Sequence, residues 1–456
     1  MTANGRRAIE QGSLIFFQNL RRKAIMPVRL DRNSADFTGR FNEFLAMKRE
    51  VSADIEAATR SIVEDVRVRG DVALIEATRK FDRLDVDASR LRVGSDEIAT
   101  AVKACDGPTI AALELARDRI ESFHRRQMPK DERFTDALGV ELGWHWSAIE
   151  SVGLYVPGGT AAYPSSVLMN AVPAKVAGVD RVVMVVPSPD GRLNPLVLAA
   201  AQLGGVSEIY RVGGAQAVAA LAYGTATVAP VAKIVGPGNA YVAAAKRLVF
   251  GKVGIDMIAG PSEVLVIADR TGNAAWIAAD LLAQAEHDVN AQSILITDDA
   301  ALASTVERAV EAQLSTLPRE DIARASWNEF GAIILVADIE DSVELANAIA
   351  AEHLEIMTSD PDALARKIRN AGAVFLGPHT PEAIGDYIGG SNHVLPTARS
   401  ARFSSGLGVL DFMKRTSVLK CGPDQLRILG PVAMTLGKAE GLDAHARSIG
   451  LRLNRS

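Results

Sequence analysis

From residue 150 onward, short runs of β-branched residues alternate with alanine-rich stretches of helical length, and this alternation constrains the fold most. The runs are apolar throughout, which is typical of strands buried on both faces of a parallel sheet. Regular succession of strand and helix predicts an α/β fold with helices on both faces of the sheet. Strands are expected at 152–156, 181–186, 208–212, 233–235, 264–268, 293–297, 332–336, 354–357 and 373–376.

Helical stretches separate these strands, and Pro261 falls between two such series. We therefore expect two tandem Rossmann-like parallel-sheet units. Helical periodicity before residue 82 and after about residue 405 predicts helical N- and C-terminal extensions. The helices between the strands are expected at 194–203, 214–224, 239–250, 272–287, 301–313, 341–351 and 361–370.

The expected domain boundaries follow these changes of pattern. Residues 1–26 carry Arg6, Arg7 and three further basic residues against one acid, and we expect a flexible extension there. Residues 27–50 are expected to form an N-terminal helical segment and 406–456 a C-terminal helical segment. The two α/β domains are assigned to 51–135 with 262–405, and to 136–261.

Composition excludes several classes of protein. The net charge is −5 and the isoelectric point about 5.9, so there is no basic footprint for nucleic acid. No apolar run approaches the roughly 18 residues of a membrane span. Only two cysteines occur, which suits a reducing cytoplasm and not a disulfide framework. We expect a cytoplasmic protein without nucleic-acid or membrane partners.

Glycine-rich turns follow two of the expected strands, at Gly213-Gly214-Ala215-Gln216 and Gly236-Pro237-Gly238-Asn239. Such a turn lets a phosphate approach the backbone at a helix N-terminus. It is equally common as a packing device in any α/β fold. The G-x-G-x-x-G fingerprint of dinucleotide binding is absent from the sequence, so spacing alone leaves cofactor binding open.

Two pairs of residues could carry chemistry. Gln284 and His287 are three residues apart near a helix end, so they share a helix face and could form half of a metal site. A histidine that contacts the last helix carbonyls is the simpler interpretation. Glu352 and His353 are adjacent and point in different directions, so they could flank a substrate as an acid–base pair or lie on the surface.

Neither cysteine has a context that favours a reactive thiolate, so covalent catalysis is not expected.

Several long segments resemble the histidinol dehydrogenase family, and the resemblance runs from about Met26 to Asn454. The segments are G-L-Y-V-P-G-G at 153–159, G-P-G-N-A at 236–240, A-G-P-S-E-V-L at 259–265, Q-A-E-H at 284–287, A-E-H-L-E at 351–355, G-D-Y at 385–387, S-N-H-V-L-P-T at 391–397 and E-G-L-D-A-H at 440–445.

The resemblance implies an aldehyde-dehydrogenase-like architecture and a homodimer that uses one Zn²⁺ per active site, NAD and L-histidinol. It implies that His353 is the general base and that Glu352 activates water for the second of two oxidations. The remaining positions follow the family motifs. The implied zinc ligands are Gln284, His287, Asp386 and His445; the implied substrate contacts are these four with Ser262, His353, His393 and Glu440; and the implied NAD contacts are Tyr155, Gln216 and Asn239.

In that family the C-terminal segments of the two subunits are intertwined, so Glu440 and His445 are expected to reach the partner's active site. A paralogous zinc- and NAD-dependent dehydrogenase of another small alcohol is one alternative, although Ser262, His393 and Glu440 are all present. A catalytically silent zinc-stabilised scaffold is another. It would lack one residue of the Glu-His pair at 352–353, and the pair is intact.

Overall fold

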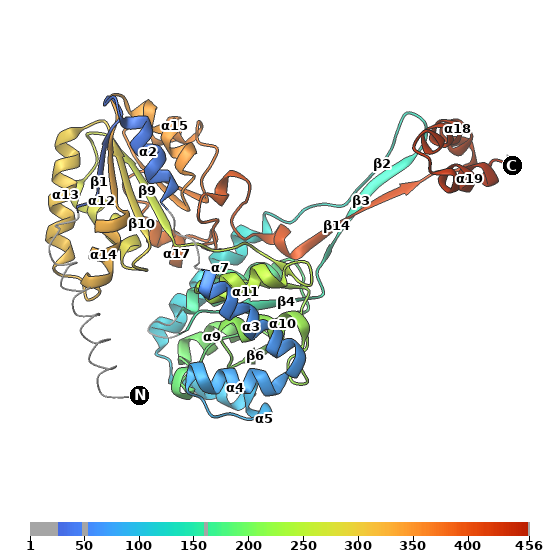
Figure 1. The fold of residues 1–456 in the computed structure, drawn as a ribbon, viewed down its shortest axis with the longest axis horizontal. Helices are drawn as coiled ribbons and strands as arrows, with labels where there is room; N and C mark the ends of the chain where they lie inside the picture. The colour runs from blue at the N-terminus through green and yellow to red at the C-terminus, as the bar shows by residue number, and fades with distance from the viewer. Residues whose placement is uncertain (1–25, 48–52, 159–162, 455–456) are drawn as a thin grey trace.

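The computed structural model describes residues 26–47, 53–158 and 163–454, and it has two parallel sheets and a thin projecting arm (Figure 1). The prediction of two parallel-sheet α/β units is confirmed. All nine predicted strands are present, and each begins and ends within two residues of its expected bounds. The extension predicted for 1–26 lies outside the described residues except for Met26. In the described ranges, no helix is both long and apolar enough to cross a bilayer.

Sheet A has six parallel strands in the order β1-β11-β10-β9-β12-β13. On one face Leu265 belongs to a core that includes Phe41, and on the other Val266 belongs to a core that includes Trp327. The strands are β1 (Val28–Asp31), β9 (Glu263–Ala268), β10 (Gln292–Thr297), β11 (Ala332–Leu335), β12 (His353–Met357) and β13 (Ala373–Leu376). The helices are α2 (Phe37–Ala46), α12 (Ala274–Ala285), α13 (Ala300–Leu314), α14 (Glu320–Phe330), α15 (Ser342–Ile349), α16 (Pro361–Ala365) and α17 (Glu382–Tyr387).

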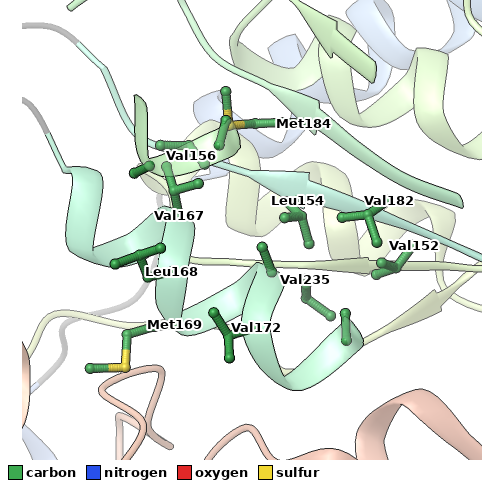
Figure 2. Close-up of a cluster of buried hydrophobic side chains, with 14 of the residues drawn as sticks. Val152, Leu154, Val156, Val167, Leu168, Met169, Val172, Val182, Met184 and Val235 are labelled. Atoms are coloured by element: carbon green, nitrogen blue, oxygen red, sulfur yellow. The ribbon is translucent and has the colours of Figure 1, made fainter. Parts of the chain in front are cut away.

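Sheet B has five parallel strands in the order β6-β5-β4-β7-β8. Valine, leucine and methionine side chains of its strands pack against α8 in the cluster of Figure 2. The strands are β4 (Ser151–Tyr155), β5 (Arg181–Val185), β6 (Glu208–Tyr210), β7 (Lys233–Val235) and β8 (Gly254–Ile255). The helices are α3 (Ala53–Arg69), α4 (Asp71–Asp82), α5 (Ala88–Leu91), α6 (Ser95–Ala104), α7 (Gly107–Arg125), α8 (Pro164–Val176), α9 (Pro195–Leu203), α10 (Gly214–Tyr223) and α11 (Ala240–Val249).

The helices of residues 53–125 pack on sheet B, so the assignment of 51–135 to the domain of sheet A is wrong. Helix α3 packs against α10 and α11, and α7 packs against α8. Val66 and Leu74 are fully buried in the same core as Tyr155 and Leu221. Helical periodicity identifies the buried face of a helix but not the sheet that the face covers, which is why the sequence misassigned these helices.

The segment 27–50 was predicted to be helical, but residues 28–31 form β1 at the edge of sheet A. This strand pairs with β11, with Leu30 opposite Ile334. Only Leu30, at 2% exposed, is fully buried in the strand itself. Four residues with one buried side chain are too short a pattern for the strand to be recognised in the sequence.

The arm is a three-stranded antiparallel sheet C in the order β14-β3-β2, and it leads to two helices far from both parallel sheets (Figure 1). The prediction of a C-terminal helical segment at 406–456 agrees with the helices at 423–439 and 443–452, but it is wrong for 413–420, which forms β14 and pairs with β3 along its whole length. Most side chains of β14 are exposed, so burial leaves no period of two in its sequence. The elements are β2 (Glu132–Thr135), β3 (Glu141–Ala148), β14 (Met413–Lys420), α18 (Pro423–Ala439) and α19 (Asp443–Arg452), with short 3₁₀ helices at Pro189–Gly191, Ile339–Asp341, Ser400–Arg402 and Val409–Phe412.

Candidate active site

The predicted acid–base pair, Glu352 and His353, lies at the amino-terminal edge of sheet A. His353 is the first residue of β12, and it lies between Val264 of β9 and Ala373 of β13. Both side chains are buried, with Glu352 5% and His353 3% exposed. A surface location for the pair is thereby excluded.

Hydrogen bonding fixes which nitrogen of His353 is available for chemistry. Its Nδ1 lies 3.2 Å from the carbonyl oxygen of Glu263, which can only accept, so Nδ1 carries the hydrogen. Nε2 is buried without a hydrogen-bond partner and lies 3.6 Å from Oδ1 of Asp386. Burial opposes a positive charge on His353, but the carboxylates of Glu352 and Glu382 help to outweigh it and raise its pKa. In the neutral ring, Nε2 is therefore the nitrogen that has a free lone pair, because Nδ1 carries the hydrogen.

Glu352 approaches the same imidazole from its other side. Its Oε2 accepts a hydrogen bond of 3.0 Å from the amide of Glu263 and lies 3.9 Å from Nδ1 of His353. Burial raises the pKa of Glu352 to about 7. A carboxyl group that changes charge near neutral pH is well matched to accept a proton from water.

Three of the four predicted metal ligands gather beside this pair. Gln284 and His287 lie at and just beyond the end of α12, and Asp386 comes from α17, which packs against α12. The Gln284 amide nitrogen is 3.2 Å from His287 Nδ1, and its oxygen Oε1 is buried without a partner. Burial lowers the pKa of His287 and keeps it neutral. Burial would raise the pKa of Asp386, but its interactions with His353 outweigh this and lower it.

The fourth predicted ligand, His445, is not part of this cluster. His445 lies in the first turn of α19, Glu440 is the C-cap of α18, and both are exposed at the far end of the arm (Figure 1). Within the described part of one chain, no cluster of three or more His, Cys, Asp or Glu side chains could hold a metal. One chain thus brings together an amide oxygen, an imidazole and a carboxylate, one donor short of the four that zinc usually takes.

The loop that carries His393 joins the two parallel-sheet domains. His393 Nδ1 lies 2.9 Å from the backbone oxygen of Asp386, and its Nε2 lies 3.2 Å from the Ser166 hydroxyl of α8. The neighbouring Asn392 donates a hydrogen bond of 2.6 Å to the backbone oxygen of Met169, also in α8. These contacts bring the predicted substrate residue His393 to the boundary between the sheet A site and the sheet B domain.

Ser262, another predicted substrate contact, lies at the amino-terminal edge of sheet A. It immediately precedes β9, and its carbonyl accepts a hydrogen bond of 3.0 Å from the amide of Gln292. The next residue, Glu263, contacts both Glu352 and His353 through its backbone. Ser262 therefore borders the acid–base pair.

The three predicted NAD residues lie at the carboxyl-terminal edge of sheet B. Tyr155 ends β4, and its hydroxyl accepts a hydrogen bond of 2.9 Å from the amide of Gly214. Gln216 lies in the first turn of α10 after β6, and Asn239 caps α11 after β7. Gly236 has φ +104°, and a Cβ there would lie 2.2 Å from the Tyr155 carbonyl oxygen, so only glycine fits this turn. Ligands of open parallel sheets bind at this edge.

Sequence reasoning missed four residues of the site: Glu382, Glu355, Asp280 and Ser166. Glu382 and Asp386 are four residues apart, so they share a face of α17, and this spacing was a readable signal. Glu355 is a carboxylate within the buried strand β12, which is a second signal because buried acids need a partner. Ser166 had no local signal, since its partner is 227 residues away.

Buried acid–base groups at one sheet edge and glycine turns at the facing edge of a second sheet define a two-domain α/β enzyme. Comparison with known proteins identifies the family. The histidinol dehydrogenase family profile matches residues 45–453. The chain is 80% identical over 430 residues to the histidinol dehydrogenase of Rhodopseudomonas palustris and 82% identical over 431 residues to that of Bradyrhizobium diazoefficiens, covering 94% of this chain and 100% of each relative.

A solved structure of histidinol dehydrogenase from Elizabethkingia anophelis superposes with a TM-score of 0.89 at 36% identity, and the match covers 94% of this chain and 98% of that one. The chain therefore belongs to the histidinol dehydrogenase family of NAD-dependent oxidoreductases.

Proposed function

We propose that this family member oxidises L-histidinol to L-histidine in two steps with two molecules of NAD⁺, and that the intermediate aldehyde stays in the site. The observation that best supports this function is the unpartnered Nε2 of His353 beside Glu352. A four-electron oxidation of an alcohol needs a base for the hydroxyl proton and a base for the water that hydrates the aldehyde. The two buried groups have the properties of that pair.

The donors beside the pair fit zinc. A buried Gln284 oxygen without a partner, a neutral His287 and an ionised Asp386 are ligands that zinc accepts. Bound zinc would supply a fixed positive charge that holds and orients the substrate's nitrogen donors. His445 is the proposed fourth ligand, and Ser262, His393 and Glu440 are the proposed further substrate contacts.

The proton chemistry is assigned to this chain's own side chains. In the first step His353 Nε2 takes the hydroxyl proton, because Nδ1 is already committed to the Glu263 carbonyl. In the second step Glu352 takes a proton from water, and its raised pKa of about 7 suits that exchange. NAD⁺ accepts a hydride in each step, and Tyr155, Gln216 and Asn239 are its proposed contacts at the edge of sheet B.

A second copy of the chain is proposed to complete each site. Glu440 and His445 are exposed at the end of the arm, remote from the Gln284 cluster of their own chain. Helix α18 also exposes Ile428, Val432 and Leu436, by 55%, 60% and 60%, and such an apolar face favours contact with another protein surface. A homodimer in which the arm of each subunit reaches the other's site explains both features.

The test of the proposed function is the yield of NADH from purified protein with L-histidinol, before and after metal chelation and zinc restoration. We expect two NADH per histidinol, lost on chelation and regained with zinc. If zinc-loaded, folded protein yields no NADH, the alternative of a paralogous dehydrogenase of another small alcohol is favoured. Other small alcohols would then be screened as substrates.

A mixing experiment tests the shared site. His353→Asn and His445→Ala variants should each be inactive alone. After subunit exchange, a mixed dimer has one site with an intact sheet A residue and an intact partner arm, so activity should return to about a quarter of the wild-type value under random exchange. No recovery in demonstrably mixed dimers would refute the exchange of arms.

The cytoplasm is the proposed location, since the chain has only two cysteines, both free.

A further inference from the structure

Beside the loop that follows β5 lies a buried carboxyl group to which the proposed mechanism gives no role. Asp82 ends α4 and is 7% exposed. Among the described residues, its side chain forms no salt bridge and accepts a single hydrogen bond, a long one of 3.4 Å from the Ser188 amide to Oδ2. Acidic side chains are almost never buried without a partner, so Asp82 is short of hydrogen-bond donors.

The place of Asp82 at sheet B is the one that binds ribose in dinucleotide folds. Counted along the chain, the order β6-β5-β4-β7 puts the first strand between the second and the fourth, as in the nucleotide-binding half of a doubly wound fold. In that fold an acidic residue after the second strand accepts a hydrogen bond from the ribose of NAD. The second strand here is β5, and Ser188 is the third residue after it. Asp82 reaches this place from α4.

The first acidic residue after β5 in the sequence, Asp190, already has a cationic partner. It forms a salt bridge of 2.7 Å with Arg83, and the side chains of Arg83 and Asp190 are 65% and 53% exposed. Because Arg83 directly follows Asp82, this pair also ties the end of α4 to the loop after β5. Asp190 is thus committed to a surface pair, and Asp82 is the acid of this edge that remains for a ligand.

Ser188 carries a second unsatisfied polar group. It is 0% exposed, and its Oγ is buried without a hydrogen-bond partner. Asp82 keeps some exposure, so it is the one of the two side chains that a ligand can reach directly. An under-bonded carboxylate together with an orphaned hydroxyl fits a ligand that brings hydroxyl groups to this edge.

One of the proposed NAD contacts lies close to Asp82. Burial raises the pKa of Tyr155 to about 12, and the charge of Asp82 adds to the rise, so the two groups are within electrostatic range. The Tyr155 hydroxyl accepts a hydrogen bond of 2.9 Å from the amide of Gly214, at the start of α10. A Cβ on Gly213 would lie 2.4 Å from Cβ of Pro187, so the turns after β5 and β6 touch. Asp82 therefore belongs to the same sheet edge as the proposed NAD site.

We propose that Asp82 accepts hydrogen bonds from the 2′- and 3′-hydroxyl groups of the adenosine ribose of NAD, and that its negative charge selects NAD over NADP. The inference rests on the proposed function, in which Tyr155 contacts NAD. A ribose diol supplies the donors that the carboxylate lacks, and hydrogen bonds to a charged acceptor are the stronger kind. NADP carries a phosphate on the 2′-oxygen, which cannot donate there and repels the carboxylate.

The first test is the binding of NADH and NADPH to Asp82→Asn, measured by fluorescence titration without histidinol. Asparagine keeps the size of the side chain and can still accept from the Ser188 amide, but it has no charge. We expect the Kd for NADH to rise on the order of 10-fold, as for the loss of one charge-assisted hydrogen bond. The ratio of the Kd for NADPH to that for NADH should fall by more than this, since the repulsion is relieved as well. An unchanged ratio overturns the inference.

A second test removes the ribose hydroxyl instead of the carboxylate. ADP and 2′-deoxy-ADP are compared as competitors that displace NADH. The wild type should bind 2′-deoxy-ADP on the order of 10-fold more weakly than ADP, and Asp82→Asn should bind the two nearly alike. This comparison decides the matter on the wild type alone where the variant does not fold, because equal affinities of the wild type for both nucleotides overturn the inference.

The matched control is Asp190→Asn, which removes a carboxylate from the same loop. Its Kd for NADH and its ratio of NADPH to NADH affinity should match those of the wild type. A loss of NADH binding in Asp190→Asn that Asp82→Asn does not show would assign the ribose to the wrong acid and overturn the inference. Absence of NADH formation from histidinol by the wild type refutes the proposed function itself, and the binding titrations still decide the role of Asp82.

Discussion

The buried ion pair of Lys246 and Asp256 offers the sharpest test of how sheet B holds its glycine turn. Their side chains are 2% and 1% exposed. Lys246 donates a hydrogen bond of 3.1 Å to the carbonyl oxygen of Gly236, and Asp256 accepts one of 2.8 Å from the amide of the same residue. Both partners thus hold the turn that is proposed to contact NAD.

The substitution Lys246→Met keeps the length of the side chain and leaves the Asp256 carboxylate without its counter-ion. Breaking a buried pair from one side costs about 3–5 kcal/mol. Asp256 still accepts hydrogen bonds from the amides of Gly236 and Met257, at 2.8 and 2.7 Å, so the lower end applies. We expect the free energy of unfolding to fall by about 3 kcal/mol, or Tm by roughly 6–12 °C for a domain of this size.

The double variant Lys246→Met/Asp256→Leu separates stability from function. Replacing both charges by apolar groups is often neutral, so most of the lost stability should return in urea unfolding. The double variant lacks both side-chain bonds to Gly236, so its KM for NAD⁺ should be higher than that of the wild type. The control is Lys233→Met, whose half-buried pair with Asp411 should contribute only about 1 kcal/mol. A wild-type KM in the double variant would refute the link between the pair and the cofactor turn.

Three further predictions concern the acid–base pair and the metal ligands. His353→Asn should slow turnover by roughly 10²–10⁴ while folding and zinc content stay normal, and unchanged turnover would remove its role as base. Glu352→Gln should slow oxidation of supplied histidinal more than oxidation of histidinol, and equal slowing of both steps would contradict this. In the wild type, the rate of the aldehyde step should rise with pH through about 7 as Glu352 ionises, and a flat profile would contradict this. Gln284→Ala and His445→Ala should each lower zinc per site on elemental analysis, and full occupancy in both would refute the ligand set.

Strands and their order along the chain could be predicted because each buried strand of a parallel sheet is a continuous apolar run. β9, with Glu263 as its only charged residue, and β10 are buried at every position, and both were expected almost to the residue. β14 was missed because its side chains are mostly exposed, and exposure removes the hydrophobic pattern on which prediction depends. The sheet that α3 and α4 cover was assigned wrongly, because helical periodicity indicates which face of a helix is buried but not which sheet it packs against.

Most residues of the candidate site could be named only from the family motifs. Spacing alone could pair Gln284 with His287, which are three residues apart, but the contact between Ser166 and His393 spans 227 residues. The tautomer of His353 also could not be read from the sequence, because it depends on the backbone carbonyl of Glu263, 90 residues away. The fold brings such groups together through the order of the strands within each sheet, and short-range sequence patterns do not specify that order.

The arrangement of the two sheets gives the site a division of labour. The acid–base groups lie at the amino-terminal edge of sheet A, around His353, and the glycine turns at the carboxyl-terminal edge of sheet B, around Gly236. His393 bridges the two domains through Ser166. Under the proposed function, a substrate held there would have its proton acceptors in the domain of sheet A and its cofactor in the domain of sheet B. Because α19, which carries His445, is remote from this cluster within its own chain, the proposed fourth donor would come only from a partner subunit, and catalysis would then be a property of the proposed dimer instead of the single subunit.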